Sequence, residues 1–382
     1  MNPRSAQTPS LIQSLARPWP FFLFVVGFAL FGLLMIYDAS VPESLLTFGH
    51  PWYYAMRHGV WVLLGIAVFA AISFIPREVL KKLSPLIFFG AILLLVAVLI
   101  PGIGSRLQGA QRWILLGPIP LQPAEISKLA VILFFSTWLE KHQRVGPFLF
   151  FTGLVTGLVL LQPNMSTTVL LGGICTALYF LAGGKMKFMA IFGSVALVLV
   201  ALLILAAPYR RDRLMTFLNP ASDPLGNSYH IRQITLALGR GGLMGQGIGL
   251  SKQKQQYIPE AANDSIFAIY AEETGYFGAL VLLGAFVLLL GVGWHIASIQ
   301  PDTFSFLTAA GITTWLGLQI LFNLAAMVAL MPLTGVPLPL ISYGGSALLS
   351  VMAGLGILLG LLRTSGTPGK SERKPKKLVR RL

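Results

Sequence analysis

The sequence predicts an all-α polytopic membrane protein with about ten transmembrane helices. Hydrophobic residues make up 55% of the 382-residue chain, and charged residues only 11%, against roughly 25% in soluble domains. Apolar blocks of about 17–25 residues, long enough to cross a bilayer, recur from residue 20 to residue 362. The stretches 21–36 and 91–100 are apolar on every face, which excludes the alternating pattern of an outer-membrane barrel.

The chain divides into a short polar start, one transmembrane domain and a basic tail. Residues 1–19 form the N-terminal segment, residues 20–363 the membrane domain with one large loop at 208–264, and residues 364–382 the tail. The tail lacks the apolar residues needed for a core, so we expect disorder there. The predicted spans are residues 20–38, 56–75, 84–100, 124–139, 147–161, 166–182, 186–207, 265–294, 304–331 and 340–362.

The distribution of Lys and Arg predicts that both termini are cytoplasmic. Short inner loops carry an excess of these residues. With the N-terminus inside, the short outer segments hold only Arg57, Arg106 and Arg112. An even number of spans returns the basic tail to the inner side. The inner segments hold Arg4, Arg17, Arg77, Lys81, Lys82, Lys141, Arg144, Lys185 and Lys187.

The large loop at 208–264 departs from this pattern, because it lies outside by parity and is nevertheless basic. Its cations predict an anionic ligand at the outer membrane face. The alternative is that a loop of this length escapes the charge rule and is merely soluble. Glycines recur between residues 239 and 249, which permits tight turns or close backbone approach. The cations are Arg210, Arg211, Arg213, Arg232, Arg240, Lys252 and Lys254.

Charged residues inside predicted spans are candidate functional groups, because an unpaired charge is costly there. Glu125 and Lys128 are three residues apart and share a helix face, either as a structural ion pair or as a pair that orients a substrate group. Asp264 precedes an apolar run, where it would cap a helix or act as a general base at the membrane edge. At least one of Glu272 and Glu273 should meet a cation or a backbone donor.

Three prolines prevent a helical start to residues 331–346. This stretch is either a wall of the same outer cleft or a tight turn before the last span. The five histidines are scattered and Cys175 is the single cysteine, so no zinc pattern or internal disulfide is predicted. No Walker motif and no G-x-S-x-G motif is present, so neither ATP-driven transport nor serine hydrolysis has support.

Several motifs in the right order resemble the SEDS family, whose members are FtsW, RodA and SpoVE. The resemblance covers nearly the whole chain, and the loop version at 247–260 is more similar to the FtsW branch than to the RodA branch. Two positions depart from the family's pattern: Asn164 where an aspartate is common, and Ser265 where an aromatic residue is common. The motifs lie at residues 35–40, 111–114, 121–128, 257–260, 264, 266–268, 271–273 and 337–346.

The resemblance implies a ten-span peptidoglycan glycosyltransferase that polymerises lipid II, the undecaprenyl-pyrophosphate-linked disaccharide pentapeptide. It further implies a class B penicillin-binding protein and other divisome proteins as partners, with membrane lipids around the protein and no nucleic acid. The expected location is the cytoplasmic membrane of a bacterium, at the division septum.

The resemblance also assigns roles to individual residues. Asp264 would be the catalytic base that activates the acceptor hydroxyl. No cofactor is certain, although a divalent cation, Mg²⁺ or Mn²⁺, could help to steady the pyrophosphate. The expected substrate-binding residues are Arg112, Glu125, Lys128, Arg210, Arg232, Lys254, Glu260 and Ser342.

Two other functions stay open at this point. A lipid II flippase would use the same cationic cleft without needing Asp264 as a base. A scaffold that recruits a class B penicillin-binding protein would keep partner binding and make no glycan, as a consequence of the changes at Asn164 and Ser265.

Overall fold

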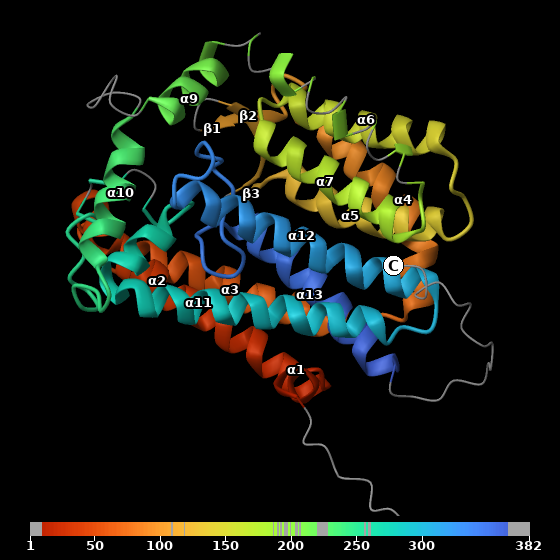
Figure 1. Ribbon diagram of the computed structural model, residues 1–382, viewed down its shortest axis with the longest axis horizontal. Coiled ribbons are helices and arrows are strands. Elements are labelled where there is room, and N and C mark those ends of the chain that lie inside the picture. The colour runs from red at the N-terminus through yellow and green to blue at the C-terminus, as the bar shows by residue number, and fades with distance from the viewer. Residues whose placement is uncertain are drawn as a thin grey trace, which may run out of the picture.

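A computed structural model shows a mostly helical chain in which long helices run side by side (Figure 1). Six helices are long and apolar enough to cross a membrane: α2 (Pro18–Phe48), α3 (Tyr53–Ile72), α4 (Arg77–Ala97), α11 (Ile266–Ser298), α12 (Thr303–Met327) and α13 (Gly345–Ser365). The structure describes residues 10–365 except 108–109, 118, 186, 189–190, 192, 195–197, 199, 203–204, 206–207, 220–227, 256 and 259–260.

The other helices are shorter. Two of them, α6 (Val145–Leu161) and α7 (Met165–Leu181), are apolar and uncharged, whereas α5 (Pro123–Leu139) carries the Glu125 and Lys128 pair. Each predicted span thus corresponds to a helix except 186–207, which lies partly outside the described residues. The membrane helical fold is confirmed, and the full count of ten spans stays a prediction. The remaining helices are α1 (Leu11–Leu15), α9 (Pro208–Leu218) and α10 (Tyr229–Gly241).

The structure corrects the purely α-helical prediction with a small antiparallel sheet between α4 and α5. Its strands are β1 (Gly104–Leu107), β2 (Ala110–Leu116) and β3 (Ile119–Leu121), in the order β1-β2-β3. An added Cβ at Gly104 would lie 1.9 Å from the carbonyl oxygen of Val98, so glycine is needed where the sheet folds back onto the end of α4.

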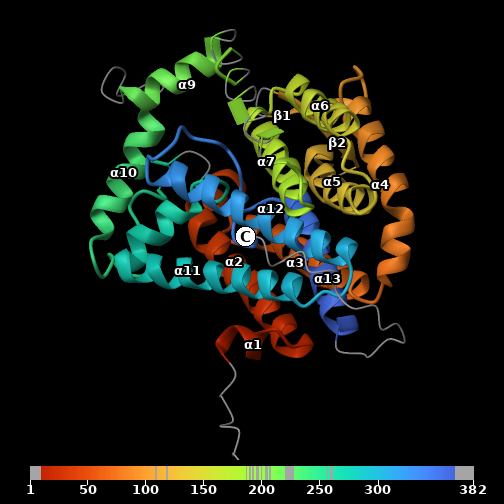
Figure 2. The same cartoon turned by 45° about the vertical axis from the view of Figure 1, so that its right-hand side comes forward.

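The core of the molecule lies around α12 and α13. In each of these helices 72% of the most apolar window is buried, compared with 28% in α4 and α11. Figures 1 and 2 show α12 and α13 in the middle of the helical body, with α4 and α11 on opposite sides. The central helices therefore carry the side chains that can fix the internal geometry, and the outer helices present apolar surface to lipid.

One end of the helical body carries the loops and small elements, and we call it the loop end (Figure 1). It includes α9, α10 and two connecting segments. The glycine-rich loop is defined as residues 242–255, and the proline-rich loop as residues 328–344, between α12 and α13. The prediction that the prolines keep the latter segment out of a helix is confirmed. The large loop predicted at 208–264 is not simply irregular, because α9 and α10 lie within it.

Candidate functional site

Asp264 lies at the loop end, immediately before α11. The helix begins at Ile266, and its N-cap residue is Ser265, so Asp264 is one residue outside the capping position considered for it. The aspartate is half-buried and faces the proline-rich loop. A Cβ added at Gly335 of that loop would lie 3.8 Å from Asp264 Oδ2. The structure thus brings the candidate base and the candidate wall of the cleft together.

The backbone around Asp264 is fixed by hydrogen bonds to the proline-rich loop. Asn323 Nδ2 on α12 donates both to the carbonyl oxygen of Asp264 and to that of Val336, each at 2.9 Å. The amide of Tyr343 donates to the carbonyl oxygen of Ala262 at 2.8 Å. Asn323 of α12 therefore fixes the backbone of Asp264 directly, and Tyr343 of the proline-rich loop fixes the chain two residues before it.

A second contact comes from α10. His230 Nε2 lies 2.8 Å from the Ser265 hydroxyl, which directly follows Asp264 in the chain. Burial, together with the positive charge of Arg213, lowers the pKa of His230 from 6.5 to about 4, so the ring is neutral at neutral pH. Ser265, one of the two departures from the family's pattern, thus holds a defined structural contact in this chain.

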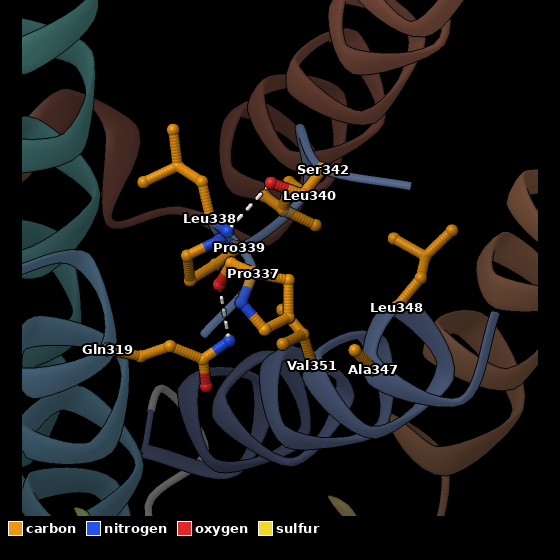
Figure 3. Close-up of a pocket in the computed structure, with 9 residues that line it drawn as sticks. All are labelled: Gln319, Pro337, Leu338, Pro339, Leu340, Ser342, Ala347, Leu348 and Val351. Atoms are coloured by element: carbon orange, nitrogen blue, oxygen red, sulfur yellow. Dashed lines mark hydrogen bonds between the residues drawn. The ribbon is translucent and has the colours of Figure 1, made fainter. Parts of the chain in front are cut away.

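The proline-rich loop is braced from inside the bundle (Figure 3). Gln319 Nε2 donates to the carbonyl oxygen of Pro337 at 2.9 Å, and the amide of Leu338 donates to the hydroxyl of Ser342 at 2.8 Å. Ser342, predicted to bind substrate, is buried and uses its hydroxyl to stabilise the loop itself. A Cβ at Gly32 of α2 would lie 2.0 Å from the Leu340 carbonyl oxygen, so glycine allows α2 to pack against the loop.

Behind this loop lies the predicted pair of Glu125 and Lys128. Lys128 Nζ is 2.8 Å from Glu125 Oε2, so the ion pair is confirmed, and Nζ also donates to Gln319 Oε1 at 3.0 Å. The ammonium lies 5.2 Å from the centroid of the Trp315 ring. Since Lys128 is only 1% exposed, contact with a substrate phosphate would require helix movement. In this conformation the pair instead supports Gln319, which holds Pro337.

The glycine-rich loop forms a separate set of contacts, with Glu272 and Glu273 of α11. The Ser251 hydroxyl donates to Glu272, and the amide of Gln253 donates to Glu272 Oε2 at 3.2 Å. The amide of Ser251 donates to Glu273 Oε1 at 3.1 Å. Arg240 Nε approaches Glu272 Oε1 at 3.5 Å. The prediction that at least one glutamate meets a cation or a backbone donor is confirmed for both.

Lys254 is the central cation of this region. Its Nζ lies 2.7 Å from Asp38 Oδ1 on α2 and 2.8 Å from Glu273 Oε1 on α11. Burial lowers the pKa of the Lys254 ammonium, but the hydrogen bonds to Asp38 and Glu273 outweigh that effect and raise it above its ordinary value. Lys254 is therefore charged and buried between two carboxylates, rather than directed toward a ligand as predicted.

The glycine-rich loop also forms hydrogen bonds to α11 where that helix is interrupted. Gly275 has φ +68 and ψ −166, which interrupts the helix. The amides of Gln246 and Gly247 donate to the carbonyl oxygens of Glu272 and Glu273, each at 3.0 Å. A Cβ at Gly245 would lie 2.0 Å from the Glu273 carbonyl oxygen. The glycines thus permit close backbone approach, as the sequence indicated.

The remaining predicted binding residues lie on separate elements. Arg112 is on β2, and the adjoining β3 is tied to the start of α13 by the Ser346 hydroxyl, which donates to the Pro120 carbonyl oxygen at 2.7 Å. Arg232 is exposed on α10. Arg210 is on α9, which reaches the proline-rich loop through Arg213, 3.2 Å from the Leu333 carbonyl oxygen. The side chain of Arg210 and all of Glu260 lie outside the described residues.

Sequence reasoning missed several residues that shape this site: Asp38, His230, Gln319 and Asn323. Gln319 and Asn323 are four residues apart on α12, which places two amides on one face of an apolar helix. That spacing was a usable signal. Asn164, the other departure from the family's pattern, is the N-cap of α7 and accepts from the amide of Thr167 at 3.3 Å. An aspartate would fill the same capping role.

No group of three or more His, Cys, Asp or Glu side chains in the described part of the chain is arranged to hold a metal ion. The carboxylates of Asp38, Glu272 and Glu273 instead form ion pairs with Lys254 and Arg240. The described residues therefore offer no built metal site beside Asp264.

Residues 19–366 match the FTSW_RODA_SPOVE family, described as cell cycle protein. A probable peptidoglycan glycosyltransferase FtsW of Coxiella burnetii is 40% identical, over 86% of this chain and 91% of its own length. Stage V sporulation protein E of Bacillus subtilis is 35% identical, over 87% of this chain and 93% of its own.

Solved structures agree with these relatives. The structure reported as "Structural coordination of polymerization and crosslinking by a peptidoglycan synthase complex" has a TM-score of 0.75 at 28% identity, over 91% of this chain and 98% of that one. RodA of Thermus thermophilus has a TM-score of 0.67 at 27% identity, over 91% and 97% of the two chains. Since the family match spans nearly the whole chain, this protein belongs to the FtsW/RodA/SpoVE family.

Proposed function

We propose that this chain is an inverting peptidoglycan glycosyltransferase that polymerises lipid II at the outer face of a bacterial cytoplasmic membrane, in septal wall synthesis. The names of its relatives support the activity, and the resemblance of the glycine-rich region to FtsW supports the septal role. The single observation that carries the proposal is the position of Asp264, which is half-buried. Its backbone carbonyl accepts a hydrogen bond from Asn323, and the nearby Ala262 carbonyl accepts one from Tyr343 of the proline-rich loop.

The chemistry needs one base and stabilisation of a departing anion. Asp264 takes the proton from the 4-hydroxyl of the acceptor N-acetylglucosamine, and that oxygen attacks the anomeric carbon of the donor N-acetylmuramic acid. The bond from that carbon to undecaprenyl pyrophosphate breaks. One displacement converts the α-linked donor into a β-1,4 linkage without a covalent enzyme intermediate. Pyrophosphate is already a good leaving group, so no protonating acid is required.

The cations take different roles in this proposal. Arg112, Arg210 and Arg232 are the residues that we assign to the pyrophosphate. Lys128 and Lys254 are positioning residues, because both are buried in ion pairs. Lys128 supports Gln319 and through it the proline-rich loop, and Lys254 fixes the glycine-rich loop. No step requires a divalent cation, although Mg²⁺ or Mn²⁺ bound by the pyrophosphate would lower the charge that the arginines must stabilise.

We further propose a class B penicillin-binding protein as partner. The support is a similar solved structure that concerns a peptidoglycan synthase complex, in which polymerisation is coordinated with crosslinking.

The test is glycan polymerisation by purified protein in detergent with labelled lipid II, with and without a class B penicillin-binding protein. Wild-type protein should make long glycan, and Asp264→Asn should make none while keeping its thermal stability. The matched control is Asp212→Asn, an exposed aspartate on α9 in the same large loop, which should keep full activity.

Two other results would redirect the proposal. Movement of labelled lipid II across a vesicle bilayer by Asp264→Asn, without glycan from any variant, would favour a flippase. Partner binding with no glycan even from wild-type protein would favour a scaffold. Wild-type polymerisation by Asp264→Asn would reject the base assignment while leaving the glycosyltransferase activity in place.

A further inference from the structure

We infer that the tip of the glycine-rich loop, residues 243–250, inserts into the bilayer leaflet at the loop end and docks on phospholipid. The inference rests on the fold and does not depend on the proposed function. It starts from an unusual exposure of large apolar side chains outside the long apolar helices. Leu243, Met244, Ile248 and Leu250 are 65%, 78%, 83% and 65% exposed.

This exposure is a consequence of how the loop is held. Its backbone amides and the side chains of Ser251 and Lys254 face inward to Glu272 and Glu273. Glycines at 245, 247 and 249 have positive φ and turn the chain repeatedly. The apolar side chains on either side of these glycines are therefore left exposed. A patch of this kind on a protein surface marks an interaction site.

The patch is continuous with the lipid-facing surface of α11. The amide of Tyr276 donates to the Gly242 carbonyl oxygen at 2.9 Å, and that of Phe277 donates to the Leu243 carbonyl oxygen at 3.3 Å. Tyr276 and Phe277 are themselves more than half exposed, and Val281, one turn further along, is 71% exposed. The loop tip thus lies beside the first aromatic residues of an apolar helix face, where aromatic side chains favour the membrane interface.

The length of α11 places this contact at the interface. From Gly275 to Ser298 the helix is about 35 Å long at 1.5 Å per residue. A hydrocarbon core of about 30 Å is crossed by that segment alone. The first turns of α11, with the buried Glu272 and Glu273, then lie above the hydrocarbon. The loop residues bonded to Tyr276 and Phe277 are at the level where the hydrocarbon begins.

The charges of this region favour an anionic surface, such as that of phospholipid head groups. Between Tyr229 and Ile258 the sequence contains Arg232, Arg240, Lys252 and Lys254 but no Asp or Glu. The side chain of Lys252, two residues from Leu250, is exposed. Apolar side chains in the acyl region combined with cations at the phosphates are the pattern of an interfacial membrane anchor.

The test measures the depth of a probe in vesicles of phosphatidylethanolamine and phosphatidylglycerol. Cys175 is the single cysteine and is buried, so Cys175→Ala gives a background for labelling with an environment-sensitive fluorophore. Ile248→Cys is the test site. Val281→Cys on α11 is the control for hydrocarbon, and Asp212→Cys on α9 is the control for water.

We expect the Ile248→Cys probe to be quenched by lipids that carry a doxyl group near the head group, several-fold more than the Asp212→Cys probe, and to be protected from iodide. Met244→Cys repeats the measurement if Ile248→Cys does not fold. Full quenching by iodide in vesicles, with no doxyl quenching, would overturn the inference. Protection that appears only after a class B penicillin-binding protein is added would also overturn it, and would assign the patch to a protein partner.

Discussion

The glycine-rich and proline-rich loops are held by different chemistry. The glycine-rich loop is fixed by charges: Lys254 lies between Asp38 and Glu273, and Glu272 accepts hydrogen bonds from the loop. The proline-rich loop is fixed by neutral amides on α12, where Gln319 and Asn323 donate to backbone carbonyl oxygens. The glycine-rich loop is thus tied to α2 and α11, and the proline-rich loop to α12 in the buried centre of the bundle.

This difference predicts unequal sensitivity to mutation. Removing one member of a buried ion pair leaves an uncompensated charge and costs about 3–5 kcal/mol. Removing an amide donor leaves carbonyl oxygens unsatisfied and costs about 1–3 kcal/mol. Mutations in the ion pairs of the glycine-rich loop should therefore mainly lower stability. Mutations of the amides that hold the proline-rich loop should mainly displace Asp264 and lower activity.

The largest effect is expected for Lys254→Met, which leaves the carboxylates of Asp38 and Glu273 buried without their cation. The free energy of unfolding should fall by about 3–5 kcal/mol, measured by thermal unfolding of the purified protein in detergent. Lys252→Met is the matched control, because the Lys252 side chain is exposed, and it should change stability little.

A triple variant sharpens this prediction. Lys254→Met combined with Asp38→Asn and Glu273→Gln removes the charges together and should recover most of the lost stability. A triple variant no more stable than Lys254→Met would show that packing, rather than charge, holds the glycine-rich loop.

The next effect concerns the backbone of the same loop. Gly245→Ala places a Cβ 2.0 Å from the Glu273 carbonyl oxygen at a residue with φ +82, so the loop must shift off α11. The left-handed conformation alone costs about 1–3 kcal/mol for a non-glycine residue. The control is Gly239→Ala on α10, where no heavy atom lies within 4 Å and alanine should stabilise the helix slightly. Equal thermal midpoints for the two variants would contradict the close approach.

Local sequence signals predicted part of this site. The three-residue spacing of Glu125 and Lys128 predicts a contact within one helix turn. The prolines at 332, 337 and 339 predict a non-helical segment, because proline restricts its own neighbours. Neither the ion pair nor the loop required knowledge of the tertiary structure. The small sheet was missed although short β-type stretches bounded by Gly and Pro were present between residues 104 and 121.

The partners of Lys254 were beyond local reasoning. Asp38 precedes Lys254 by 216 residues, and no pattern in either segment indicates that α2 and the glycine-rich loop meet. A basic loop at a membrane surface suggested an anionic ligand, whereas the structure gives this particular cation two carboxylates of its own chain. The sequence did predict that a buried glutamate of α11 needs a cation or a backbone donor. That prediction covers the Glu273 side of the ion pair with Lys254, but not Asp38.

The amide side of the comparison is tested by Asn323→Ala. This change removes the donor to the Asp264 and Val336 carbonyl oxygens and should cost about 1–3 kcal/mol, less than Lys254→Met. Polymerisation should fall several-fold further than the loss of folded protein explains, because the backbone of Asp264 is released. Leu321→Ala, an exposed position on the same helix, should leave both quantities nearly unchanged. A stability loss as large as that of Lys254→Met would erase the distinction between the two loops.

The last effect appears only below neutral pH, and it is a pH dependence at His230, the neutral contact between α10 and Ser265. Its pKa is lowered to about 4 in the folded protein from 6.5, chiefly by burial and further by Arg213, so the unfolded chain binds a proton that the folded chain rejects. Stability from the neutral ring is present above pH 6.5 and is lost as the pH falls toward 4. His230→Gln keeps a polar partner for Ser265 and removes the titration. As the pH falls from 6.5 to 4, the thermal midpoint of the wild type should therefore drop more than that of the variant. A difference between the two midpoints that stays constant with pH would mean that His230 does not titrate as a buried neutral group.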